Sequence, residues 1–184
     1  MKRHMEKKTM AEENPKDARP FRTSLAAQTA ARVVIETARE CELLDDGGLV
    51  VDPALAEMEK ALFAGMFKAV ARRGGAELTP DEFSSMFHFV TARAAEAATA
   101  CWSGRPFETG TDGLFDGKTP FYAADELKGY IHGLDFPVRC AQNCWDLYAA
   151  DRGGDPLLRL FESLKWCFRI GCHASLRFLE KRGS

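Results

Sequence analysis

The sequence has no long run of apolar residues and little net charge. A helix that spans a membrane needs about 18 or more consecutive apolar residues, and no segment of this 184-residue chain approaches that length. The formal net charge of −2 gives no reason to expect strong non-specific binding to nucleic acid. The first residues also lack the apolar stretch of a secretory signal, so we expect a cytoplasmic protein whose thiols are reduced.

Familiar catalytic and cofactor motifs are missing as well. Glycine pairs occur at 47–48, 74–75 and 153–154, and none of them forms a phosphate-binding loop or a dinucleotide fingerprint. The carboxylates do not form the Glu-x-x-His pattern of di-iron bundles. Strand-like sequence is scarce, because only residues 48–51 are enriched in β-branched side chains. These absences favour a non-enzymatic, all-α protein.

Three helix starts are marked by a proline that follows a capping residue, at Asp52-Pro53, Thr79-Pro80 and Asp155-Pro156. The oxygen of Asp or Thr can accept the free N–H groups of a first turn, where proline costs no hydrogen bond. A helical apolar periodicity follows each start. The whole pattern predicts six helices, at about 23–44, 53–73, 80–102, 121–134, 137–150 and 156–181.

Helices joined mostly by short turns predict an antiparallel bundle. We expect residues 21–184 to form one domain, which suits a chain of this length. Residues 1–20 have almost no apolar content and should be a disordered arm or an arm that awaits a partner.

Charge is unevenly distributed along the chain. Residues 1–22 carry seven basic and four acidic side chains, and residues 157–184 carry six basic and two acidic ones. The part between them carries 12 basic and 21 acidic side chains. The net charges of these parts are therefore +3, +4 and −9. An acidic body with basic ends can fold back on itself or pair end to middle between protomers.

Four of the cysteines lie near the C-terminus: Cys140, Cys144, Cys167 and Cys172. The first two share a helical face, and the other two lie on the last predicted helix. If these two helices pack antiparallel, the thiols can converge on zinc or an iron–sulfur cluster. The alternative, which we favour, is that the cysteines are small buried side chains in a close helix contact and that no cofactor is bound.

The last predicted helix carries a basic residue at every fourth position: Lys165, Arg169, His173, Arg177 and Lys181. A basic amphipathic helix can lie on an anionic membrane or dock on an acidic partner. We favour a terminal helix that caps the bundle, because the acidic body offers an internal counter-surface.

Residues 103–119 form a long loop with aromatic residues within it and around it. Long ordered loops are often functional. The alternative of a ligand-binding or enzymatic bundle therefore places a pocket under this loop, lined by Trp102, Phe107, Phe115 and Tyr122.

Apolar residues cover more than one face of the second and third predicted helices, with Phe63, Met66 and Phe67 on the second. Such a helix is either central or buries its second face against another chain. The leading hypothesis is therefore a non-enzymatic protein-interaction or regulatory module that associates with itself. The metal-binding bundle and the small-molecule or enzymatic bundle remain the alternatives.

Overall fold

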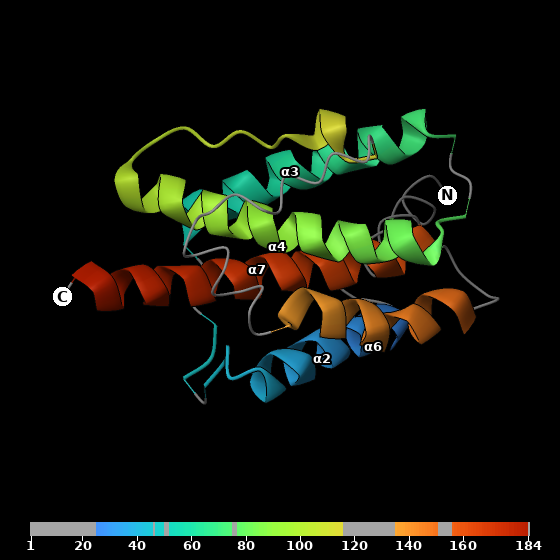
Figure 1. The fold of residues 1–184 in the computed structure, drawn as a ribbon, viewed down its shortest axis with the longest axis horizontal. Coiled ribbons are helices and arrows are strands. Elements are labelled where there is room, and N and C mark those ends of the chain that lie inside the picture. Colours follow the sequence, from blue (N-terminus) through green and yellow to red (C-terminus); the bar gives the residue numbers. More distant parts are fainter. Residues whose placement is uncertain are drawn as a thin grey trace, which may run out of the picture.

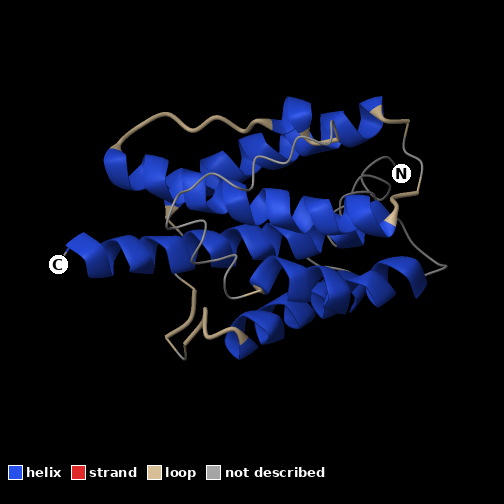
Figure 2. Ribbon diagram, in the orientation of Figure 1, coloured by secondary structure: helices blue, strands red, loops and turns tan. Residues whose placement is uncertain are grey.

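The described part of the computed structural model comprises residues 25–45, 47–49, 52–74, 77–115, 135–150 and 156–183. These residues form five α-helices and one short 3₁₀ helix, without a strand (Figure 2). The elements are α2 (Leu25–Glu40), α3 (Pro53–Arg72), α4 (Pro80–Ser103), η1 (Thr111–Gly113), α6 (Phe136–Ala150) and α7 (Pro156–Gly183). The all-α class is confirmed. The predicted helix at 121–134 and the predicted arm at 1–20 lie outside the described residues, so the count of about six stays a prediction.

Two predicted helix starts have the capping bonds that their sequences indicate. The carboxylate of Asp52 accepts the N–H of Ala54 at 2.8 Å, and α3 begins at Pro53. At the start of α4, Thr79 and Glu82 cap each other's backbone N–H groups in a reciprocal capping box. Pro156 begins α7 as predicted.

The first predicted helix ends earlier than its sequence suggests. We expected the stop at residues 45–48, but α2 ends at Glu40. Glu42 adopts a left-handed conformation with φ of 59°, and the N–H of Leu43 donates to the carbonyl of Ala38 at 2.9 Å. This is the closing bond of a Schellman turn, formed here without glycine.

α4 and α7 lie side by side at the centre of the molecule, with α2 and α6 on one side of them and α3 on the other (Figure 1). They run in the same direction, because Ala94 packs on Gly171 and Trp102 lies beside Gly183. α6 runs antiparallel to α7, since Cys140 neighbours Cys167 and Cys144 neighbours Ser163. A fully antiparallel bundle is therefore not confirmed.

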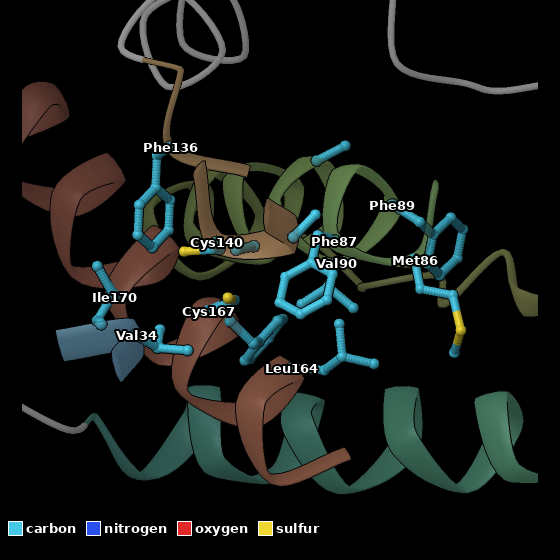
Figure 3. Packing of buried hydrophobic residues seen from close by; sticks show 14 of the residues in the cluster. Val34, Met86, Phe87, Phe89, Val90, Phe136, Cys140, Leu164, Cys167 and Ile170 are labelled. Carbon is cyan, nitrogen blue, oxygen red and sulfur yellow. The ribbon is translucent and has the colours of Figure 1, made fainter. Parts of the chain in front are cut away.

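α4 supplies most of the core. Among its largest side chains, Phe83, Met86, Phe87, Phe89 and Val90 are each no more than 2% exposed. Figure 3 shows part of this packing, in which α4 meets side chains of α6 and α7. The helix that is apolar nearly all round is thus the central one.

α3 is peripheral, and its apolar residues are divided between two environments. Phe63 and Met66 are buried, whereas Phe67 is 43% exposed. The ring of Phe67 stacks on Phe161 of α7 with ring centres 4.0 Å apart. One face of this aromatic side chain therefore remains open to solvent.

Two basic residues of α7 pair with acidic residues of the body. Arg169 donates two hydrogen bonds to Glu59 of α3, at 2.8 and 2.9 Å. Arg177 pairs with Asp45, beyond the end of α2. These pairs supply the internal acidic counter-surface that the sequence predicts. The predicted capping position is wrong, because α7 lies at the centre of the bundle and is buried along most of its length. Among the described helices, none contains an apolar stretch that could span a lipid bilayer.

Candidate functional site

A groove opens between the first turns of α4 and the facing side of α6, with a volume of about 330 Å³. Its lining is mainly apolar and consists of Pro80, Phe83, Ser84, Val138, Ala141, Gln142 and Trp145. Phe83 and Ala141 are buried beneath it, and Val138 and Trp145 are partly exposed along it. No local sequence pattern indicates this groove, because its two walls are more than 50 residues apart in the chain.

Aromatic packing fixes the floor of the groove. The ring centres of Phe83 and Trp145 are 5.1 Å apart in an edge-to-face arrangement, and those of Phe83 and Tyr148 are 5.0 Å apart. The Tyr148 hydroxyl accepts the backbone N–H of Leu78 at 3.1 Å. Because Leu78 directly precedes the N-cap of α4, this bond ties the end of α6 to the start of α4. The groove is consequently preformed.

The rim of the groove is acidic. Asp81 lies one helical turn before Ser84, and Asp146 lies one turn after Gln142, and both carboxylates are exposed. The nearby cation Arg139 turns away from the groove, because it pairs with Glu40 of α2. Neither Asp81 nor Asp146 forms an ion pair with any of the described residues. A ligand in this groove would therefore meet apolar walls and negative charge at their edge.

Three of the predicted metal-ligand cysteines, Cys140, Cys144 and Cys167, are brought together between α6 and α7. The thiols of Cys140 and Cys167 share a hydrogen bond, and Figure 3 shows both in the packed core. Burial raises the pKa of Cys140 well above its usual value and that of Cys144 to about 12. Burial also raises the pKa of Cys167. At neutral pH these groups are thiols, which are poor nucleophiles.

The fourth cysteine of that set, Cys172, lies elsewhere. It follows Cys167 by five residues, which on a helix is a rotation of about 140°. Its thiol points toward α4 and donates to the carbonyl of Ala94 at 3.6 Å. Cys41, which the sequence did not associate with the cluster, lies near Cys140 and accepts from Arg139 at 3.6 Å.

No group of three or more His, Cys, Asp or Glu side chains in the described ranges is arranged to hold a metal ion. Zinc or an iron–sulfur cluster at Cys140, Cys144, Cys167 and Cys172 remains a prediction, and metal analysis of protein purified without chelator would test it. Binding would require the buried thiols to lose their protons, which burial makes costly.

The aromatic residues predicted to line a pocket under the 103–119 loop are spread along α4. Trp102 lies at the C-terminal end of α4 and is 51% exposed. Phe115 lies under Arg73, which pairs with Glu82 at the opposite end of α4. Phe107 is partly buried against the core, and Tyr122 lies outside the described residues. The structure does not bring Trp102 and Phe115 together.

A second hollow, of about 250 Å³, lies between the turn after α2 and the last part of α7. Asp45 and Arg177 pair across it. His173, one turn before Arg177, is only 8% exposed, and its Nε2 has no hydrogen-bond partner. Burial and the nearby Arg177 lower the pKa of His173, so the ring is neutral at neutral pH.

Comparisons of the chain with protein-family models, with curated proteins and with solved structures find no match.

Proposed function

We propose that this protein is a non-enzymatic interaction module that binds an apolar, basic-flanked segment of a protein in the groove between α4 and α6. The observation that carries the proposal is an open apolar groove with a fixed floor and an acidic rim. Its volume of about 330 Å³ falls in the range of binding pockets.

The chemistry of the lining favours binding over catalysis. Its polar members are the hydroxyl of Ser84 and the amide of Gln142, and none of the lining side chains can exchange a proton near neutral pH. General acid–base catalysis needs a titratable group within hydrogen-bond reach of the reacting atom. The lining offers instead a surface that excludes water from an apolar side chain.

The shape of the site supports a protein segment as the ligand. Two helices form its walls, and helix pairs bind amphipathic segments through anchors spaced one turn apart. Asp81 and Asp146 would steer basic residues of the segment and fix its register.

The proposal is tested with two fluorescein-labelled helical peptides, one of leucine and lysine and the other of leucine and glutamate. We expect the lysine peptide to bind about tenfold or more tightly, a difference of about 1.4 kcal/mol. Ser84→Arg puts a bulky cation in the groove and should abolish binding, while melting curves check its fold. Ala64→Arg, on the exposed face of α3, is the matched control and should bind normally. Equal binding by the Ser84→Arg and Ala64→Arg variants would refute the proposal.

The proposed module also associates with itself, and exposed apolar side chains support this part of the proposal. Phe67 of α3 is 43% exposed and Leu158 of α7 is 57% exposed. Both lie beside Phe161. The ring of Phe67 stacks on it, and Leu158 lies three residues before it on the same face of α7. Burial of these side chains against a second copy would remove apolar surface from water.

A further inference from the structure

We infer that residues 1–10 of the chain itself bind in the groove between α4 and α6 of the same molecule and compete there with an external partner. This inference rests on the proposed function, because it names an intramolecular ligand for the same site.

The composition of residues 1–10 matches the chemistry of the groove. They contain Lys2, Arg3, Lys7 and Lys8 against a single acidic residue, Glu6, for a net charge of +3. The same residues include three methionines, at positions 1, 5 and 10. Methionine side chains adapt to irregular apolar surfaces. Basic residues beside such anchors complement the carboxylates of Asp81 and Asp146, which form no ion pair with any described residue.

The other basic region of the chain is already engaged. In α7, Arg169 binds Glu59 and Arg177 binds Asp45. The acidic charge near these arginines is thereby partly neutralised, whereas the acidic rim of the groove has no cation among the described residues. Charge complementarity thus favours the groove for the N-terminal residues.

The chain is long enough for this contact within one molecule. α2 runs antiparallel to α6, because Asn143 bonds to Thr37 and Arg139 pairs with Glu40. α2 therefore begins at the end of the molecule where α6 finishes, close to the Trp145 end of the groove. An extended chain from Leu25 back to Met10 spans up to about 50 Å.

Such a tethered ligand has a defined consequence for the partner. A segment joined to its site by a short chain acts at an effective concentration on the order of millimolar. The apparent dissociation constant of an external ligand therefore equals the intrinsic constant divided by the fraction of molecules in which the groove is free. A partner must displace residues 1–10 before it binds.

The inference is tested by photo-crosslinking in the full-length protein. The photoreactive residue p-benzoylphenylalanine replaces Gln142, which is exposed and lines the groove. We expect crosslinks to residues 1–10 within one chain, at a yield that does not change with protein concentration. The same replacement at Lys68, exposed on α3, is the control and should give none. Crosslinks only between chains, or none to residues 1–10 from position 142, would overturn the inference.

A charge exchange separates specific contact from chance proximity. Asp81→Lys with Asp146→Lys should reduce the crosslink yield, and the further changes Lys7→Glu and Lys8→Glu should restore it. Alone, Lys7→Glu with Lys8→Glu should strengthen binding of the leucine–lysine peptide roughly 3- to 10-fold, because it releases the groove. Unchanged peptide affinity in that variant would contradict the inference.

The two proposals fail in different ways. If the leucine–lysine peptide binds the groove but residues 1–10 do not crosslink to it, the proposed function stands and the inference is wrong. If the peptide fails to bind even in the Lys7→Glu, Lys8→Glu variant and no crosslink forms, both are wrong.

Discussion

At the scale of single residues, Gly171 sets the separation of the two central helices. A Cβ at this position would lie 2.8 Å from the Cβ of Ala94 on α4. Because both atoms are attached directly to helical backbone, neither can rotate away, and the helices themselves would have to separate. The close approach of α4 and α7 therefore depends on this glycine.

We expect Gly171→Ala to lower the free energy of unfolding by about 1–3 kcal/mol, as overpacking does in other cores. Gly65→Ala is the matched control. Its Cβ would meet Oγ1, Cγ2 and Cβ of Thr111 at 2.4, 3.0 and 3.1 Å, so the one-turn helix η1 would have to shift. That shift does not disturb the contact between the two central helices, and alanine favours the helix by about 1 kcal/mol. Gly65→Ala should therefore lower the free energy of unfolding less than Gly171→Ala does. Denaturation by urea measures both variants, and an unchanged midpoint for Gly171→Ala would show that the contact is not tight.

The partly buried His88 and the buried His173 give the protein a defined response to acid. Burial lowers the pKa of His88 and of His173 from the usual value of 6.5. Arg177 lowers the pKa of His173 further, while Asp45 and Glu180 oppose it. As the pH falls below 6.5, the unfolded chain binds protons at these residues before the folded chain does, so stability decreases.

The expected result is a lower urea midpoint at pH 5.5 than at pH 7.5, and a smaller difference in the variant His88→Gln, His173→Gln. The carboxylates of Asp45 and Glu82, whose pKa values are lowered by their hydrogen bonds, lose their contribution only at pH values below their usual pKa of about 4. The two effects therefore occupy different pH ranges. A difference that persists unchanged in the double variant would assign the response to other groups.

At the scale of elements, one hydrogen bond connects α6 to the cap of α4. Leu78 is buried, and its backbone N–H donates to the Tyr148 hydroxyl at 3.1 Å. Tyr148→Phe keeps the ring beside Phe83 but leaves that N–H without its acceptor. An unsatisfied buried donor costs about 1–3 kcal/mol.

We expect Tyr148→Phe to lower the free energy of unfolding by that amount and to weaken binding of the leucine–lysine peptide, since the floor of the groove loses its anchor. Thermal and urea denaturation measure the first effect and fluorescence anisotropy the second. Thr79→Ala serves as the comparison, because it removes a cap of similar value at the same end of α4 without touching α6. Full peptide affinity in Tyr148→Phe would show that the bond does not shape the groove.

At the scale of the whole molecule, the proposed self-association requires a second copy of the chain to cover α3. Phe67 is the aromatic residue that α3 leaves partly exposed. We expect light scattering at micromolar concentration to give a mass above that of a monomer, and Phe67→Ser to return it toward 20.4 kDa. Lys68→Ser, at the adjacent exposed position, is the control and should leave the mass unchanged. A strictly monomeric wild-type protein would contradict self-association.

Local sequence predicted the individual helices well where capping residues and proline coincide. Asp52-Pro53 and Thr79-Pro80 begin α3 and α4 because the cap and the fixed φ of proline act within one turn. The end of α2 was misplaced because Glu42 takes a left-handed conformation that its residue type does not announce. The predicted convergence of four cysteines holds for three of them. Cys140 and Cys144 share a face of α6 through their four-residue spacing and meet Cys167 of α7. Cys172, five residues after Cys167, lies on another face of α7 and points toward α4.

The all-α class, the starts of α3, α4 and α7, and the apolar surface of α4 can be predicted from the chain, because each depends on contacts within a few residues. The parallel direction of α4 and α7, the exposure of Phe67 beside the buried Phe63, and the meeting of Phe83 and Trp145 in a groove become visible only in the fold. These features depend on which helix faces lie against each other, and that choice is made by packing between segments far apart in the chain.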